Sequence, residues 1–410
     1  MARLVAPPLS LYIHFPWCVR KCPYCDFNSY TLHGELPEES YIERLERDIR
    51  NQAVQVSGRE IVSIFMGGGT PSLFAPKAIG RVLETARRHL RIADTVEVTM
   101  EANPGTIERG RFAEYRAAGI NRVSLGAQSF NAQRLETLGR IHSPEETRRA
   151  AEELHACGLE NFNLDLMYAL PGQDVAAAVA DLDAAIALQP THLSHYQLTL
   201  ESGTVFAAQP PPGLPDDDVA AEMLAACGDR LAAAGFEHYE VSAYARTGRR
   251  CAHNLNYWAF GDYLGVGAGA HGKLTFPSTG LEAPGKINLA DEGSIVRTTQ
   301  IRDPRRYLAG GEETLGRKNV PARDLPFEFM LNALRLVDGF EREMFAERTG
   351  LDWTVVASEI DHLTRRELLT VQDARLTPTL VGMRFLNEML LCFVAESTGL
   401  TEAFGLSTAV

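Results

Sequence analysis

Three cysteines lie within eight positions of one another near the start of the chain, in the stretch FPWCVRKCPYC at residues 15–25. Cys18, Cys22 and Cys25 follow a C-x-x-x-C-x-x-C spacing, whereas the other four of the seven cysteines stand singly. An odd number of cysteines without a regular framework is typical of a reducing compartment, where thiols stay free. Three free thiols at this spacing can act together as ligands of a metal.

Three explanations compete for this spacing. Inert core packing is disfavoured because Pro16, Lys21 and Pro23 interrupt the segment. A zinc knuckle with His14 as its fourth ligand is a second possibility, although structural zinc sites usually combine two separated ligand pairs. The third is an iron–sulfur cubane, which needs four ligands, so that three cysteines leave one iron open to chelate a small molecule. The spacing favours this 4Fe–4S cluster.

Polar residues and glycines also stand at the ends of apolar runs. Gly67 to Gly69 follow the second run without the lysine of a P-loop, so they either allow a close backbone approach to a ligand or form a tight turn. Glu101, Gln128 and Asp165 lie in or near the C-terminal ends of three successive runs. Each could be an ordinary surface or core residue, but barrel enzymes assemble their sites at that face. Their joint placement therefore predicts a binding site.

The apolar runs themselves predict an α/β fold. They alternate with helical patterns, one of which begins with Ser143, Pro144 and Glu146 as N-cap, first-turn proline and capping-box partner, and ends at Gly158. Six parallel strands with helical crossovers predict an open, partial (β/α)6 barrel, and a doubly wound sheet is the alternative. The six runs are residues 11–15, 61–67, 95–101, 122–128, 162–170 and 192–200.

Two changes in composition divide the chain into three predicted domains. A proline-rich stretch at residues 207–218 ends the barrel, at 1–206, and begins a linker and α/β extension, at 207–319. Short helices and a hairpin-like stretch at 368–380 predict a winged-helix-like domain at 320–410. Between residues 324 and 392 we count 12 acidic residues against 7 basic ones, which favours a structural or partner-docking role over DNA binding.

The composition excludes several classes of protein. A net charge of −13 disfavours binding to phosphate backbones, so we expect no nucleic-acid partner. No run approaches the roughly 18 apolar residues of a membrane span, so we expect no integral membrane segment. The N-terminal stretch MARLVAPPLS lacks an apolar core, so we expect no secretory signal. We therefore expect a cytoplasmic protein.

The cysteine spacing directly after a first strand resembles the radical SAM superfamily, whose members bind S-adenosylmethionine (SAM) at the open iron of a 4Fe–4S cluster. The words YIHFPWC, GGGTP, EANP, SLGAQSF, LGRIHS and NLDLMYALPGQ resemble the coproporphyrinogen III oxidase-like branch, over essentially the whole chain. The resemblance implies a cluster on Cys18, Cys22 and Cys25, and an Arg140 that pairs with the SAM carboxylate. The SAM-binding residues that it implies are Tyr12, Tyr24, Gly68, Gly69, Thr70, Glu101, Gln128, Arg140 and Asp165.

Two departures separate this chain from the oxidase pattern. The oxidase carries a further cysteine two positions after the third ligand, where this chain has Phe27, and it has an extension before the motif that here begins at Tyr12. Both features resemble the HemW-type haem chaperones, which hold haem and deliver it to an acceptor. The resemblance implies a haem-accepting partner protein and, if SAM is cleaved, an electron donor. The oxygen-independent oxidase, which decarboxylates its substrate by radical chemistry, and another radical SAM haem-modifying enzyme are the alternatives.

The stretch HNLNYW, at residues 253–258, matches the H-N-x-x-Y-W word of the HemW-type proteins. A histidine can ligate haem iron, and Tyr257 and Trp258 can pack on a porphyrin face. The alternative is a core histidine with aromatic packing. His253 is the predicted haem ligand, with Cys251 and His271 as candidates for a second one. No C-x-x-C-H motif occurs, so covalent attachment of the cytochrome c kind is not expected.

Overall fold

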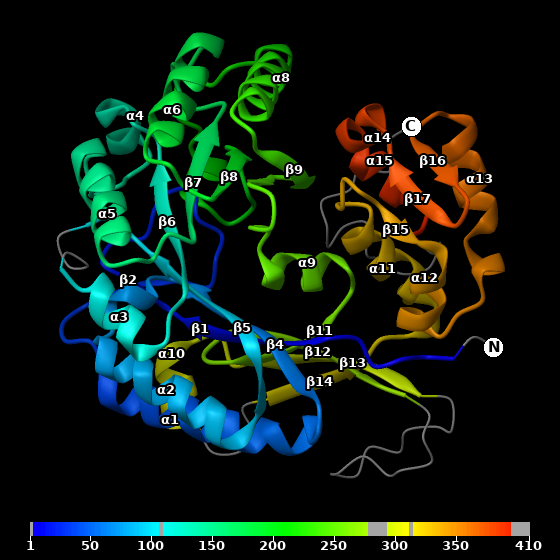
Figure 1. The fold of residues 1–410 in the computed structure, drawn as a ribbon, viewed down its shortest axis with the longest axis horizontal. Coiled ribbons are helices and arrows are strands. Elements are labelled where there is room, and N and C mark those ends of the chain that lie inside the picture. Colours follow the sequence, from blue (N-terminus) through cyan, green and yellow to red (C-terminus); the bar gives the residue numbers. More distant parts are fainter. Residues whose placement is uncertain (1–2, 106–109, 278–292, 311–314, 395–410) are drawn as a thin grey trace.

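A computed structural model describes residues 3–105, 110–277, 293–310 and 315–394, and its centre is one large curved sheet (Figure 1). Six strands lie parallel and adjacent in chain order, so the predicted partial barrel is confirmed. The order never reverses, as a doubly wound sheet would require, so that alternative is wrong. The strands are β1 (Leu9–Phe15), β4 (Glu60–Gly68), β5 (Arg91–Ala102), β6 (Arg122–Gln128), β7 (Phe162–Tyr168) and β8 (His192–Gln197).

Helices cover the outer face of this sheet (Figure 1). The predicted capping box is present: the Ser143 side chain accepts the N–H of Glu146, and the Glu146 carboxylate accepts the N–H of Ser143. Pro144 occupies the first turn and Gly158 follows the end of this helix with a φ of +74°. The covering helices are α1 (Glu38–Ala53), α2 (Pro76–His89), α3 (Phe112–Ala118), α4 (Ala132–Thr137), α5 (Pro144–Ala156) and α6 (Val175–Ala187).

Residues 207–319 add strands to both edges of the barrel sheet. After α8 (Asp217–Ala233), β9 (Glu237–Glu240) and β10 (Ala243–Ala245) form a hairpin next to β8. On the other edge β11 (Asp262–Val266) runs parallel to β1, and three antiparallel strands continue the sheet: β12 (His271–Phe276), β13 (Ser294–Gln300) and β14 (Leu315–Asn319). This segment therefore shares the sheet of the barrel, and its separation as a domain stays a prediction.

The HNLNYW stretch forms α9 (Ala252–Trp258), which lies in the hollow of the curved sheet (Figure 1). It contacts β1, β4 and β11 of the sheet and α11 (Leu325–Ala333) of the C-terminal part. A segment more than 230 residues after β1 is thereby packed against it.

The C-terminal part has the predicted winged-helix order and its own apolar core, in which Phe329 packs edge-on against Phe340 and Phe345. After α11 come β15 (Phe340–Glu341), α12 (Arg342–Thr349), α13 (Ala357–Arg365), the hairpin of β16 (Leu369–Gln372) and β17 (Arg375–Pro378), α14 (Leu380–Arg384) and α15 (Leu386–Leu391). Residues 395–410 of the predicted domain lie outside the described residues. Among the helices that the structure describes, none is both long and apolar enough to cross a membrane.

Candidate functional site

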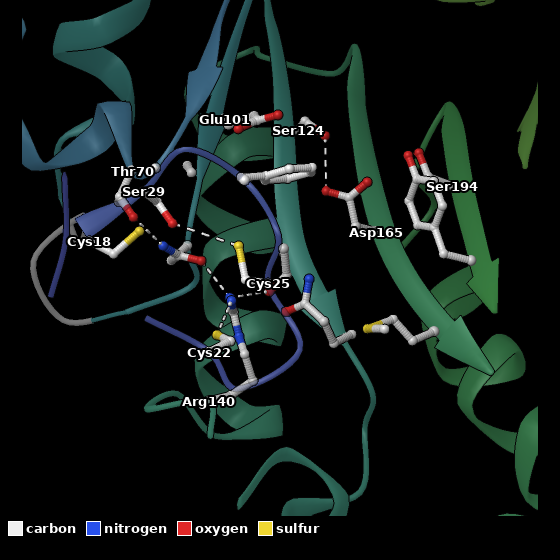
Figure 2. A pocket seen from close by; sticks show the side chains of 18 of the residues that line it. Cys18, Cys22, Cys25, Ser29, Thr70, Glu101, Ser124, Arg140, Asp165 and Ser194 are labelled. Atoms are coloured by element: carbon white, nitrogen blue, oxygen red, sulfur yellow. Dashed lines mark hydrogen bonds between the residues drawn. The ribbon is translucent and has the colours of Figure 1, made fainter. Parts of the chain in front are cut away.

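A pocket of about 690 Å³ lies between the cysteine loop, the inner faces of β5 to β8 and the first turn of α9. Every predicted site residue lines it except Tyr12 and His253. Figure 2 shows the three cysteines and Arg140 on one side of this pocket and Asp165 on the other. The strand ends that the sequence indicated therefore do meet at one cavity.

The cysteine loop is held at its base by two short strands, β2 (Trp17–Cys18) and β3 (Tyr30–Thr31), which pair in parallel. Within the loop Lys21 donates hydrogen bonds of 3.0 Å to the carbonyl oxygens of Phe27 and Ser29. All three loop cysteines are half-buried free thiols. The loop thus carries its thiols on a defined backbone along one wall of the pocket.

The zinc alternative does not fit this geometry. Both ring nitrogens of His14 are engaged: Nδ1 lies 2.9 Å from the hydroxyl of Tyr12, and Nε2 lies 2.9 Å from the carbonyl oxygen of Asn28. Across the described ranges, no three His, Cys, Asp or Glu side chains converge as one metal ion requires. The ligands of a cubane bind different irons and need not converge on a single ion, so this finding does not count against a cluster.

The glycines at the end of β4 make room for the protein's own atoms. Gly68 has a φ of +107°, and a Cβ there would stand 2.1 Å from the ring of His14. A Cβ on Gly69 would stand 2.6 Å from the carbonyl oxygens of Phe15 and Trp17. The N–H of Gly68 donates to Glu101 Oε2 at 3.0 Å. The glycines are needed for the close contact between β4, β1 and Glu101.

We expect Gly68→Ala to lower the free energy of unfolding by about 2–4 kcal/mol, since it combines a strained φ with overpacking against His14. Gly58→Ala is the matched control, because Gly58 also has a positive φ (+81°) but has no atom within 4 Å of an added Cβ. It should cost about 1 kcal/mol, from the backbone alone. Urea denaturation of both variants measures the difference, and equal losses would contradict the steric argument.

Two buried carboxyl groups face the pocket from β5 and β7, the strands on either side of β6. Burial, together with the charge of Asp165, raises the pKa of Glu101 to about 8. Burial also raises the pKa of Asp165, although its oxygens accept hydrogen bonds from Asn163 at 2.8 Å and Ser124 at 3.1 Å. Two carboxyl groups in this state favour a ligand that brings a positive charge and hydroxyl donors.

Arg140 connects the cysteine loop to the strand ends. Its Nη1 lies 3.6 Å from Cys22 Sγ, and its Nη2 donates to the carbonyl oxygen of Gly126 at 3.0 Å and to Asn103 Oδ1. Asn103 in turn donates to Thr70 Oγ1 at 3.0 Å. The Nε of Arg140 is buried without a hydrogen-bond partner. Arg140 therefore places a positive charge beside a predicted cluster ligand.

Three further predicted residues have distinct surroundings. Gln128 lines the pocket with a φ of +58°, and its Oε1 is buried without a partner. Tyr24 lines the pocket and packs against Phe206 of α7 (Val205–Ala208). Tyr12 does not line the pocket, because its ring lies behind that of Phe65. Its predicted contact with SAM stays a prediction.

His253 lies next to the pocket, behind one aromatic ring. Its imidazole stacks on Phe65, with 4.9 Å between the ring centres, and Phe65 lines the pocket. Its Nδ1 is buried without a hydrogen-bond partner, and burial, with the charge of Arg122, lowers its pKa to about 4. Of the two candidate second ligands, Cys251 lines the pocket and His271 does not.

Sequence reasoning missed several polar residues of the pocket. Asn103 follows Glu101 within the word EANP, and Ser124 and Arg122 precede Gln128 at alternate positions of β6. Alternate residues of a strand share a face, so the period of two that leads back from Gln128 could have identified Ser124 and Arg122.

Comparisons with known proteins agree with this fold. Residues 12–185 match the radical SAM superfamily, and residues 320–385 match the HemN C-terminal domain. The heme chaperone HemW of Escherichia coli (strain K12) is 47% identical over 390 residues, which are 95% of this chain and 99% of that protein. Heme chaperone HemW of Haemophilus influenzae is 44% identical over 394 residues, again 95% of this chain and 99% of that protein.

A solved structure shares the overall architecture. Coproporphyrinogen III oxidase (HemN) from Escherichia coli, a radical SAM enzyme, matches with a TM-score of 0.77 over 96% of this chain and 91% of that chain. Its sequence identity is 22%, so this likeness concerns the fold alone. The identity to the HemW proteins extends over nearly the full length of both chains, and this chain therefore belongs to the HemW family within the radical SAM superfamily.

Proposed function

We propose that this protein is a haem chaperone that binds a 4Fe–4S cluster, SAM and haem and transfers the haem to an acceptor protein. The observation that carries the proposal is His253, whose neutral imidazole has a buried, unpartnered Nδ1 beside the pocket. A neutral imidazole is the form that ligates a metal. The HemW relatives, named as heme chaperones, support the same proposal.

The cysteine loop is the proposed cluster site. Cys18, Cys22 and Cys25 would each bind one iron, and the fourth iron would be left for SAM. A bound cluster supplies a chelating iron and an electron. The chain contributes the charge of Arg140, whose Nη1 lies 3.6 Å from Cys22 Sγ, and a hydroxyl, Ser29 Oγ, 3.7 Å from Cys25 Sγ. Both contacts stabilise thiolates, which are the ligating form of cysteine.

The opposite wall is the proposed SAM site. SAM carries an ammonium group, a sulfonium group and ribose hydroxyls, which suit the raised pKa values of Glu101 and Asp165, because a nearby positive charge restores their ionised form. Arg140 is the proposed partner of the SAM carboxylate. The other proposed contacts are the pocket-lining residues Tyr24, Gly68, Gly69, Thr70 and Gln128, together with Tyr12.

The mouth of the pocket supports binding over chemistry on a small substrate. Phe27, at the position where the oxidase has a further cysteine, is 58% exposed, and Ile141 is 59% exposed; both line the pocket. Exposed apolar side chains around a cavity favour a large, partly apolar ligand or a protein partner. A haem-accepting protein and, if SAM is cleaved, an electron donor belong to the proposal, as does a cytoplasmic location.

A pair of anaerobic assays on the reconstituted protein tests the proposal. One sample receives coproporphyrinogen III, SAM and a reductant, and the other is titrated with haem. We expect stoichiometric haem binding and no protoporphyrinogen. Formation of protoporphyrinogen would instead identify an oxidase.

A variant pair tests the haem ligand. His253→Ala should shift the Soret band and weaken haem binding more than about tenfold. A loss of about tenfold is what removal of a residue that only contacts a metal ligand causes. His195→Ala is the matched control: the His195 imidazole is also stacked on an aromatic ring and has an unpartnered Nδ1, but that ring, Tyr168, does not line the pocket, whereas Phe65 beside His253 does. Equal haem affinities of the two variants would contradict the role of His253.

A further inference from the structure

Arg122 is a buried cation at the deep end of the pocket, and neither the proposed cluster site nor the proposed SAM site uses it. It is the first residue of β6, its side chain is 2% exposed, and it lines the pocket. Ser124 lies two residues later on the same face of the strand and contacts Asp165. Arg122 therefore lies further from the pocket mouth than the Glu101 and Asp165 carboxyl groups of the proposed SAM site.

The guanidinium of Arg122 has donors that no described residue uses. Its Nε is buried without a hydrogen-bond partner. Among the described residues its ionic partner is Glu97, whose Oε2 is 3.9 Å from Nε, which is too far for a hydrogen bond. A guanidinium has five N–H donors, and leaving them unpaired in a buried place costs free energy. A carboxylate ligand would satisfy two of them at once in a bidentate pair.

Glu97 cannot easily move to satisfy Arg122, because it already holds the start of α9. Its Oε1 accepts the N–H of Ala252 at 3.0 Å, the N–H of His253 at 3.5 Å and the thiol of Cys251 at 3.4 Å. The same carboxylate therefore connects Arg122 to the backbone of the proposed haem ligand. The unused N–H groups of Arg122 consequently lie in the neighbourhood of His253.

We propose that Arg122 is a carboxylate-binding residue of this pocket and takes a propionate of haem whose iron is held by His253. This inference rests on the proposed haem function and names the group that fixes the orientation of the haem. Of the arginines among the described lining residues, Arg20 is exposed on the cysteine loop and Arg140 donates to Asn103 and Gly126. Arg140 also has an unpartnered Nε, but its two terminal nitrogens are engaged, whereas Arg122 donates no hydrogen bond to any described residue.

A titration with haem and with haem dimethyl ester tests the inference. The ester keeps the iron and the ring but has no carboxylates, so the ratio of the two dissociation constants isolates the propionates. The wild-type protein should bind haem about ten- to a hundredfold more tightly than the ester, as expected for hydrogen bonds to a charged group. Arg122→Gln should lose most of this preference. Arg20→Gln, which removes an exposed arginine of the same pocket, should keep it.

The outcomes separate a failure of the proposed propionate subsite at Arg122 from a failure of the proposed haem function. Equal affinity of the wild-type protein for haem and its ester, or an unchanged preference in Arg122→Gln, would overturn the subsite and leave haem binding intact. Failure of the wild-type protein to bind either compound would overturn both. Iron content and thermal unfolding verify that Arg122→Gln is folded. If it is not, Arg122→Lys replaces it, and its preference should fall to a few-fold because lysine lacks the planar pair of donors; an undiminished preference would overturn the subsite.

Discussion

Cys22→Ser is expected to remove most of the iron from the anaerobically reconstituted protein, from about four irons per chain in the wild-type protein to fewer than one. A serine hydroxyl is a harder ligand than a thiolate and is not deprotonated at neutral pH, so the cluster loses one of its three protein ligands. The Nη1 of Arg140, 3.6 Å from Cys22 Sγ, would also lose the charge that it faces. Colorimetric iron determination and the absorption of the thiolate–iron bonds both report the loss.

Cys157→Ser is the control for this experiment. Cys157 is also a half-buried free thiol, but it lies at the end of α5, and its thiol bonds to the carbonyl oxygen of Leu154 at 3.3 Å. Iron in Cys157→Ser should equal that in the wild-type protein. Equal iron in the two serine variants would show that the cysteine loop is not the cluster site.

The parts of the fold that the sequence predicted well are those in which the determining residues are neighbours in the chain. The N-terminus of α5 is determined within four residues by Ser143, Pro144 and Glu146, and the structure contains both hydrogen bonds of the capping box. The barrel strands were recognised because each is a short apolar run between helical crossovers. Their C-terminal ends share one face, so the meeting of Glu101, Gln128 and Asp165 at one pocket followed from the strand assignment.

The remaining parts depend on contacts between distant segments. The position of α9 in the hollow of the sheet rests on Glu97, which accepts the N–H of Ala252 across 155 positions of the chain. No local pattern in HNLNYW predicts that partner, and the short helix has no side-chain cap of its own. The addition of β11 next to β1 is equally non-local, since it pairs Leu9 with Asp262. Pairing of this kind is decided by packing in three dimensions and leaves little trace in either segment alone.

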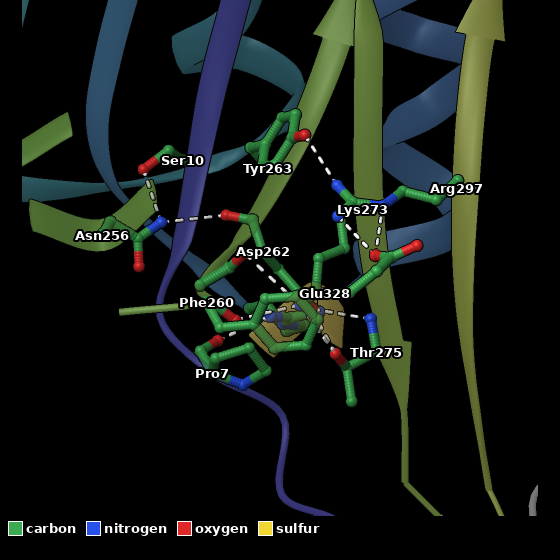
Figure 3. Close-up of polar contacts among 12 residues, drawn as sticks. Pro7, Ser10, Asn256, Phe260, Asp262, Tyr263, Lys273, Thr275, Arg297 and Glu328 are labelled. Carbon is green, nitrogen blue, oxygen red and sulfur yellow. Dashed lines mark hydrogen bonds and ion pairs between the residues drawn. The ribbon is translucent and has the colours of Figure 1, made fainter. Parts of the chain in front are cut away.

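Lys273→Met is expected to lower the free energy of unfolding by about 3–5 kcal/mol, the range for removal of one partner from a buried ion pair. Figure 3 shows Lys273 and Asp262 at the centre of a polar network between β11 and β12. Lys273 Nζ lies 2.8 Å from Asp262 Oδ1 and donates to the carbonyl oxygen of Phe260 at 3.0 Å, and both side chains are within 1% of complete burial. Methionine fills a similar volume, but it places no positive charge beside Asp262 and donates no hydrogen bond to the Phe260 carbonyl oxygen.

The effect should extend beyond the ion pair, because the network joins the barrel sheet to the C-terminal core. Lys273 Nζ lies 4.2 Å from the ring centre of Phe260, and that ring packs edge-on against Phe329 of α11. Arg88→Met is the matched control: it removes an ion pair of 2.6 Å with Glu84, but on an exposed helix surface, and should cost no more than about 0.5 kcal/mol. Urea denaturation of both variants gives the comparison. A loss of less than 1 kcal/mol in Lys273→Met would mean that the second cation, Arg59, whose Nη1 lies 2.8 Å from Asp262 Oδ2, is enough to balance the buried carboxylate.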